Sequence, residues 1–376
     1  MKKVWLYLEN GVYLEANSFG AEGTSVGEII FNTSFSGYQE IISDPSCAGQ
    51  FITFTMPEIG NVGVNSQDME SNAAHAKGVI VRKYQKRYSN FRAEESLESF
   101  LQKYNLIGIC DIDTRYLTTI IREEGSMMMV ASTKISDKNE LKRILESSEL
   151  IEKINYVEQV SSKAPYKHVH GMYADTKFEF NEAPKSEANI VVVDFGVKQN
   201  ILNELVQAKM SVEVLPNNFK AEDLITRYKA KEIDGVFLSN GPGNPMVLKQ
   251  EQIEIKKLID AKVPMVGYGL GHQLLSIAHG YETYKLKFGH HGGNHPVKNV
   301  QLGTVEISGQ NHNYNVPETI AEIAEITHIN LFDNTIEAVK YKNAPIFSVQ
   351  YHPESIPTLK NGCNVFCEFL KLIKRA

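Results

Sequence analysis

The sequence predicts an α/β protein of two parts: a mixed α/β N-terminal domain, followed by a doubly wound parallel sheet. Beyond residue 188, apolar strand-like runs alternate with helix-like segments, an order typical of parallel sheets covered by helices. Before residue 155, strand-like runs lie among turns that contain Gly and Pro. A length of 376 residues is also more than one hydrophobic core usually serves.

The boundary between the two parts is predicted from a change in composition. A polar, weakly periodic stretch starts near residue 161 and ends near residue 187. We therefore expect an N-terminal domain over residues 1–155, a linker over 156–188 and a C-terminal domain over 189–376.

Within the C-terminal domain the order of elements follows hydrophobic periodicity. The run IVVVD at 190–194 is continuously apolar, as expected for a strand buried on both faces. The expected strands are 190–194, 211–215, 234–238, 264–266, 303–308, 336–341 and 345–350. The expected helices are 200–208, 221–230 and 252–261. In the N-terminal domain we expect strands at 4–8, 28–32 and 51–55, and a helix at 141–150.

Composition and charge exclude several classes of protein. A formal net charge of −6 is mild for this length and gives no support for nucleic acid or a membrane surface as a partner. No apolar run approaches the length of a membrane span. The four cysteines form no CxxC motif, so we expect reduced thiols, a cytoplasmic protein and no metal site. The i, i+4 pair Cys363 and Cys367 is interpreted as packing on a helix.

The run VGYGLGHQ at residues 266–273 has the pattern of a nucleophile elbow that lacks its nucleophile. It follows an apolar strand and leads into a helix-like segment, and such a turn presents a side chain at the end of a sheet. The position of that side chain is occupied by Gly269.

Two further segments predict acyl-transfer chemistry at the same edge of the sheet. The turn at 240–243 (NGPG) lets backbone amides approach a ligand, so Gly241 and Leu270 are expected to donate to an oxyanion. In the run QYHPE at 350–354, Glu354 lies two residues after His352 and is expected to orient it as in a catalytic triad.

Together these motifs resemble those of class I glutamine amidotransferases, whose pattern is G-x-C-x-G-H-Q followed much later by H-P-E. Within that class the chain resembles the small subunit of carbamoyl phosphate synthetase over nearly its whole length. The segments that carry this second resemblance are 28–50, 60–63, 111–122, 288–297 and 308–312. The N-terminal domain distinguishes this family from the other class I amidotransferases, because most other amidotransferase glutaminases lack it.

The resemblance implies hydrolysis of glutamine and transfer of ammonia to a large subunit, which makes carbamoyl phosphate from bicarbonate with ATP and Mg. It implies no cofactor bound by this chain itself. His352 is implied as general base and acid. The residues implied to contact glutamine are Ser46, Gly241, Gly243, Leu270, Gln273, Asn311, Asn313 through its backbone, and Tyr314. The family usually has Gly and Phe at the last two positions, and Ser46 would make the site interdomain.

Gly269 removes the thiolate that the family uses as nucleophile, so we expect little or no glutaminase activity. We expect the fold to be kept, because Gly accepts the strained backbone of an elbow without penalty. Cys47, next to Ser46, is interpreted as a packed thiol rather than a substitute nucleophile, and Tyr268 is expected to point elsewhere.

Several alternatives stay open at this point. The chain is either an impaired glutaminase subunit or a non-catalytic subunit that binds glutamine and supports an ammonia-dependent synthetase. A third hypothesis is an amidotransferase serving nucleotide or anthranilate synthesis. Gly269 is either natural or introduced, and the pathway is either pyrimidine or arginine synthesis.

Overall fold

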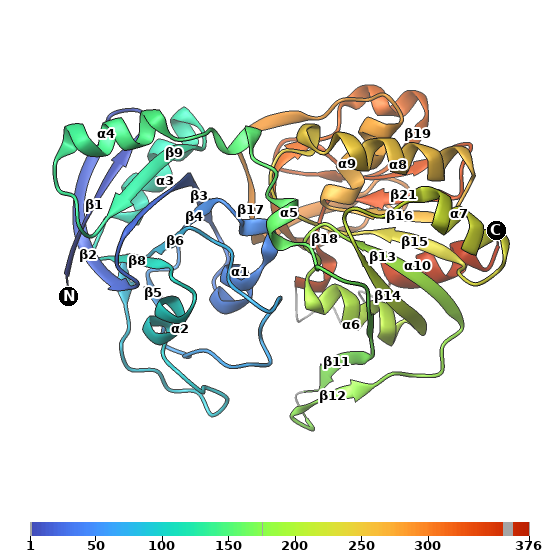
Figure 1. Ribbon diagram of the computed structural model, residues 1–376, viewed down its shortest axis with the longest axis horizontal. Helices are drawn as coiled ribbons and strands as arrows, with labels where there is room; N and C mark the ends of the chain where they lie inside the picture. Colours follow the sequence, from blue (N-terminus) through green and yellow to red (C-terminus); the bar gives the residue numbers. More distant parts are fainter. Residues whose placement is uncertain (1, 175, 356–363, 376) are drawn as a thin grey trace. The chain divides into compact units, whose positions relative to one another are not determined.

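The computed structural model describes residues 2–174, 176–355 and 364–375. The chain divides into two units, each with its own core (Figure 1). Unit 1 comprises Met1–Tyr156 and Leu286–Gly292, and unit 2 comprises Val157–Lys285 and Gly293–Ala376. The short segment at 286–292 therefore belongs with the N-terminal part, although it comes late in the sequence.

Unit 1 is built on a closed barrel of seven strands in the order β1-β2-β8-β6-β4-β3-β9. These strands are β1 (Lys2–Leu8), β2 (Tyr13–Gly20), β3 (Thr24–Asn32), β4 (Gln50–Phe54), β6 (Gly78–Ile80), β8 (Ile107–Cys110) and β9 (Met127–Ser132). The short strands β5 (Glu58–Ile59) and β7 (Lys83–Tyr84) pair separately. The strands expected at 4–8, 28–32 and 51–55 correspond to β1, β3 and β4.

The helices of unit 1 pack on this barrel through amphipathic faces. They are α1 (Tyr38–Ser43), α2 (Leu97–Lys103), α3 (Thr114–Glu124) and α4 (Lys138–Ser147), with short 3-10 turns at Pro45–Cys47 and Ile151–Lys153. Asp113 caps α3, because its carboxylate accepts hydrogen bonds from the amides of Arg115 and Tyr116. Leu117 and Ile121 then lie one turn apart on the face of α3 that joins the apolar cluster of β1, β3 and β4.

Unit 2 contains a sheet of ten strands in the order β10-β14-β13-β15-β16-β21-β20-β19-β17-β18. Its parallel part consists of β14 (Met210–Pro216), β13 (Ala188–Asp194), β15 (Gly235–Leu238), β16 (Met265–Tyr268) and β21 (Ile346–Val349). Its remaining strands are β10 (Tyr166–His168), β20 (Ile336–Tyr341), β19 (Ala324–Asn330), β17 (Tyr284–Asn299) and β18 (Val305–Asn315).

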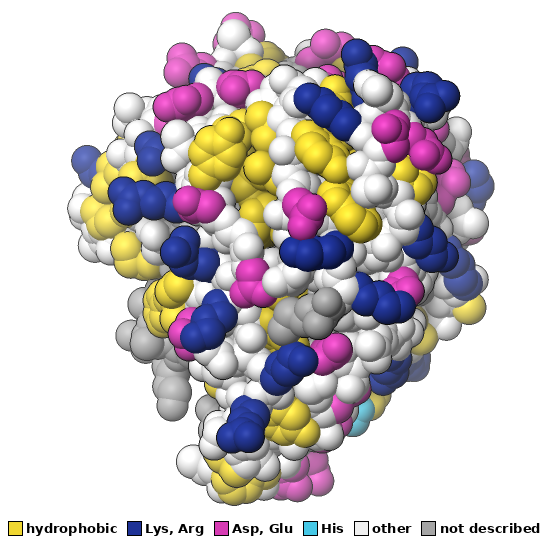
Figure 2. Space-filling view, turned by 90° about the vertical axis from the view of Figure 1, so that its left-hand side faces the viewer, with side chains coloured by type: hydrophobic (Ala, Val, Ile, Leu, Met, Phe, Trp, Pro, Cys, Tyr) yellow, Lys and Arg dark blue, Asp and Glu magenta, His cyan; other side chains and the backbone are white. Residues whose placement is uncertain are grey.

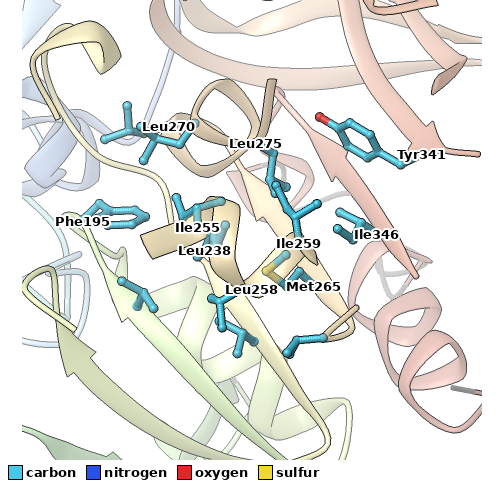
Figure 3. Packing of buried hydrophobic residues seen from close by; sticks show 14 of the residues in the cluster. Phe195, Leu238, Ile255, Leu258, Ile259, Met265, Leu270, Leu275, Tyr341 and Ile346 are labelled. Atoms are coloured by element: carbon cyan, nitrogen blue, oxygen red, sulfur yellow. The ribbon is translucent and has the colours of Figure 1, made fainter. Parts of the chain in front are cut away.

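Helices cover both faces of this sheet, as the doubly wound prediction requires. Leu224 of α7 (Ala221–Lys229), Ile255 of α8 (Lys249–Asp260) and Leu274 of α9 (Leu270–Ala278) belong to one apolar cluster. Ile201 of α6 (Gln199–Gln207) and Phe366 of α10 (Asn364–Ile373) belong to another. The fold class predicted from the sequence is confirmed. The first cluster also contains Phe195 and Leu270, so the start of α9 is anchored in the core (Figure 3).

The segment expected as a linker contains secondary structure that its polar composition did not predict. After α5 (Val157–Val160), strand β10 pairs antiparallel with β14. Strands β11 (His170–Ala174) and β12 (Glu179–Glu182) form a two-stranded ladder with each other. Such pairing depends on backbone hydrogen bonds to distant strands, which hydrophobic periodicity does not report.

Other features bear on the remaining expectations. In the part of the chain that the structure describes, no helix is long and apolar enough to cross a membrane. Figure 2 shows acidic and basic side chains interspersed on one face rather than gathered by sign. Cys47 and Cys110 are buried free thiols, but Cys367 is disulfide-bonded, so the expectation of four reduced thiols is wrong. Cys363 lies outside the described residues.

Candidate active site

The predicted site residues of unit 2 lie where neighbouring parallel strands end. Because β15, β16 and β21 run side by side in the same direction, the segments that follow them meet at one edge of the sheet. In open α/β sheets this edge is where ligands bind. The three segments carry the glycine-rich turn, the elbow and the run that contains His352.

The elbow is formed at Gly269, between the end of β16 and the start of α9. Its backbone has φ 54° and ψ −109°, a conformation that residues other than glycine rarely adopt. The amide of Gly269 donates to the carbonyl of Val349 at 2.8 Å, which ties the elbow to the end of β21. The sharp strand-to-helix turn is thus present although the nucleophile is not.

The direction in which a side chain at position 269 would point follows from the backbone. A Cβ built on Gly269 lies 3.8 Å from Nε2 of His352 and 3.3 Å from Cβ of Asn240. The contact with Asn240 is tighter than ordinary van der Waals contact, so this neighbour must shift by a few tenths of an ångström to admit a side chain. Residue 269 therefore faces the imidazole, as a nucleophile must face its general base.

His352 is held on both sides. Its backbone forms an antiparallel bridge with Gly309 of β18, with the His352 amide donating at 2.8 Å. Its Nδ1 lies 2.9 Å from Oε1 of Glu354, and both side chains are almost fully buried. A carboxylate at Nδ1 fixes the ring so that Nε2 is left toward position 269, which is the arrangement of a catalytic triad.

The carboxylate of Glu354 has two more partners that the sequence did not predict. Nζ of Lys198, at the N-cap of α6, lies 3.2 Å from Oε1, and its side chain is only 6% exposed. The hydroxyl of Tyr268 donates to Oε2. Burial raises the pKa of Glu354, but the charges of Lys198 and His352 and these hydrogen bonds outweigh it and hold the pKa well below its usual range.

The amides expected to form the oxyanion hole are those of Gly241 and Leu270, and this role stays a prediction. Leu270 is the first residue of α9, whose N-terminus favours negative charge. Within the described part of the chain, neither the amide of Gly241 nor that of Leu270 donates a hydrogen bond. A Cβ on Gly241 would lie 2.2 Å from the carbonyl oxygen of Phe195, so the turn can pack this closely only with glycine.

The remaining residues expected to contact glutamine in unit 2 lie on α9, β18 and the glycine-rich turn. Gln273 is buried, and its Nε2 donates to the carbonyl of Tyr314 and to Oε1 of Gln350, each at 3.0 Å. Asn311 and Asn313 are partly buried and share one face of β18, while Tyr314 lies on the other face. Gly243 has a φ of 85° in the turn that follows β15. These assignments stay predictions.

Ser46 lies in unit 1 and is described there alone. It is buried in the 3-10 turn Pro45–Cys47, where its amide donates to Oδ1 of Asp44 at 2.8 Å. Its expected role in glutamine binding stays a prediction.

Two charged residues near Glu354 were missed because no local pattern marks them. Lys198 follows the end of β13, and only the tertiary structure shows that its ammonium lies at the carboxylate. Glu204 of α6 is partly buried; burial, and secondly the charge of Glu354, raise its pKa to about 7. For Lys198 the sequence offers no stronger signal than a lysine in the loop between an apolar strand and the next helix.

Each of the two units matches a known protein family. Residues 191–372 match the family described as glutamine amidotransferase class-I, and residues 6–131 match carbamoyl-phosphate synthase small chain, CPSase domain. Fold, site and match agree that unit 2 is a class I glutamine amidotransferase domain.

Similarity to curated relatives extends over the whole chain. A carbamoyl phosphate synthase small chain of Helicobacter hepaticus is 55% identical over 372 residues, covering 99% of this chain and 98% of the relative. The small chain of Campylobacter jejuni is 56% identical over 371 residues, covering 99% and 100%. That of Aquifex aeolicus is 44% identical over 372 residues, covering 99% of each. The chain belongs to the carbamoyl phosphate synthase small chain family.

Proposed function

We propose that this chain is the small subunit of a carbamoyl phosphate synthase, that it binds glutamine, and that it hydrolyses glutamine slowly or not at all. The observation that carries the proposal is Gly269, which occupies an intact elbow opposite Nε2 of His352 and offers no nucleophilic atom. The partner is a large subunit that receives ammonia and uses bicarbonate, ATP and Mg. This chain itself is proposed to need no cofactor.

The chemistry of the family shows which step is lost. A thiolate would attack the carboxamide carbon, His352 would protonate the departing ammonia, and water would then hydrolyse the thioester. The amides of Gly241 and Leu270 would stabilise the oxyanion. Without a group at 269 the covalent route has no first step, whereas binding and oxyanion stabilisation keep their donors. Loss of one triad member typically costs about three to six orders of magnitude.

Among the described residues, neither Tyr268 nor Cys47 is suited to act as a substitute nucleophile. The hydroxyl of Tyr268 is committed to Glu354. Burial and the nearby carboxylate raise the pKa of Tyr268 well above its usual value, which disfavours a phenolate. Cys47 is buried in the core of unit 1.

The test compares this chain with Gly269→Cys, each in complex with the large subunit. Glutamine binding is measured by calorimetry and hydrolysis by glutamate release. We expect both forms to bind glutamine, and the cysteine form to release glutamate at least about 1,000 times faster. The matched control is Gly280→Cys, a positive-φ glycine just beyond α9 with open space around it. A folded, glutamine-binding Gly269→Cys complex without activity would contradict the proposal.

The second candidate is a non-catalytic subunit that supports ammonia-dependent synthesis. The same observation at Gly269 favours it, and the two candidates differ in what cysteine restores. If Gly269→Cys gains activity, the rest of the glutaminase machinery is intact. The pathway served and a cytoplasmic location stay predictions.

A further inference from the structure

We propose that Tyr268 is a positioning residue: its hydroxyl fixes the Glu354 carboxylate so that Oε1 faces Nδ1 of His352. The inference rests on the proposed function in assigning His352 and Glu354 to the glutaminase site. It adds a residue directly before the elbow, at a position that the amidotransferase pattern leaves unspecified.

Packing alone fixes the ring of Tyr268, independently of the hydrogen bond that its hydroxyl makes. Tyr268 ends β16, and its side chain is fully buried. Its ring is tilted against Phe237 at 5.7 Å and stacked on Phe366 at 6.1 Å between centroids. It also meets the His352 ring edge-on at 5.2 Å. An aromatic ring packed on three sides has one available orientation, which directs the hydroxyl at Oε2 of Glu354.

The contacts of Glu354 divide between its two oxygens. Oε1 accepts from Nδ1 of His352 and lies close to Nζ of Lys198, whereas Oε2 accepts from Tyr268. The first two contacts hold one oxygen of the carboxylate, and the third holds the other. With both oxygens held, the plane of the carboxylate has one orientation toward Nδ1. A fixed carboxylate keeps the proton of His352 on Nδ1, so that Nε2 stays an acceptor toward position 269.

The groups around the Glu354 carboxylate determine how it responds when the Tyr268 hydroxyl is removed. Lys198 faces it as a cation and His352 lies on another side. Burial raises the pKa of Glu204 of α6, and Glu354 is close enough for its charge to raise that pKa further. Removing the Tyr268 hydroxyl leaves Oε2 buried with one donor fewer, so the carboxylate is less well oriented toward Nδ1 of His352.

The kinetic test uses Tyr268→Phe in the Gly269→Cys form, in complex with the large subunit. We expect kcat for glutamate release to fall about 5- to 50-fold, with KM for glutamine within about twofold. The matched control is Tyr341→Phe, which also removes a buried hydroxyl, but on β20. It should leave kcat and KM unchanged. Equal values of kcat in Tyr268→Phe and its parent would overturn the proposal.

A second measurement does not depend on restored activity. In the unmodified chain, the ¹⁵N shifts of His352, assigned with His352→Gln, report which ring nitrogen carries the proton at high pH. We expect one tautomer, protonated on Nδ1, and a mixture of tautomers in Tyr268→Phe. A single unchanged tautomer in both forms would overturn the positioning role. Failure of Gly269→Cys to gain activity would instead count against the proposed function alone.

Discussion

Two neighbouring strand ends in unit 2 carry the two halves of one site, and only one half is complete. At the end of β16, position 269 has the elbow backbone and no reactive group. After the end of β21, His352 is hydrogen-bonded to Glu354, and the Glu354 carboxylate also contacts Lys198 and Tyr268. The difference teaches that backbone geometry and side-chain chemistry are fixed separately. Contacts of the main chain hold the elbow, so its shape does not depend on a cysteine.

The largest expected effect tests whether the complete half depends on its buried cation. In Lys198→Met the Glu354 carboxylate stays buried without its ammonium partner, so we expect the free energy of unfolding to fall by about 3–5 kcal/mol. The pKa of Glu354 is lowered in the folded state, so its stabilising contribution is present above about pH 4.3 and lost as pH falls below it. The variant should therefore lose less stability on acidification. Denaturant unfolding at pH 7 and pH 4 measures both.

The control for this change is Lys209→Met. Lys209 pairs with Glu187 at 2.7 Å, but both side chains are solvent-accessible. An exposed pair contributes about 0–1 kcal/mol. Equal losses in the two variants would mean that the Lys198 contact is no stronger than a surface pair.

The next effect tests whether the complete half can still activate a nucleophile. In Gly269→Cys, we expect His352 to convert the thiol to a thiolate, so that alkylation by iodoacetamide at pH 6.5 is roughly 30 to 100 times faster than for an ordinary cysteine. Cys47 and Cys110 give little background because both are buried, and burial raises the pKa of Cys110 to about 12. Mass spectrometry locates the label.

The matched comparison is the double variant Gly269→Cys with His352→Asn. It should react no faster than an ordinary cysteine, because no base remains to form the thiolate. If the two forms react equally fast, the imidazole does not face residue 269 in solution.

A smaller effect tests the strain at the elbow. In Gly269→Ala the new Cβ makes a tight contact with Cβ of Asn240 at 3.3 Å, and the φ of 54° with ψ of −109° is costly for any side chain. We expect the free energy of unfolding to fall by about 1–2 kcal/mol, after a gain of about 0.4–1 kcal/mol from lower unfolded-state entropy. Thermal and urea unfolding measure it. Gly303→Ala, with φ 71° and open space, controls for positive φ away from the site, and a gain in stability for Gly269→Ala would contradict the assignment of strain.

The smallest effect concerns Glu204, whose pKa is raised to about 7, mainly by burial. Between about pH 4.3 and 7 the folded state binds the extra proton, so this residue's contribution to stability is lost as pH rises through 7. Glu204→Gln should remove about 1 kcal/mol of that decline, a figure reduced for partial solvent screening. Unfolding measured at pH 5 and pH 8 shows it, and parallel pH profiles for the two forms would contradict it.

Local patterns predicted much of unit 2 and less of unit 1. The continuous apolar runs at β13 and β15 marked strands buried on both faces, and their alternation with helices gave the doubly wound order. The seven-stranded barrel was not predicted, because its closure depends on pairings such as β1 with β9, more than 100 residues apart. The strand β10 was likewise missed inside a polar segment.

The sequence by itself determined the family resemblance, the elbow pattern and the absence of a nucleophile at position 269, because these depend only on residue types and on their spacing along the chain. Only the tertiary structure decided which way position 269 faces and which groups surround Glu354. Lys198, Tyr268 and Glu354 come from three segments separated by 70 and 86 residues. Their charges act on one another only after the strands align, since buried electrostatic contacts depend on distance in space and not on distance along the chain.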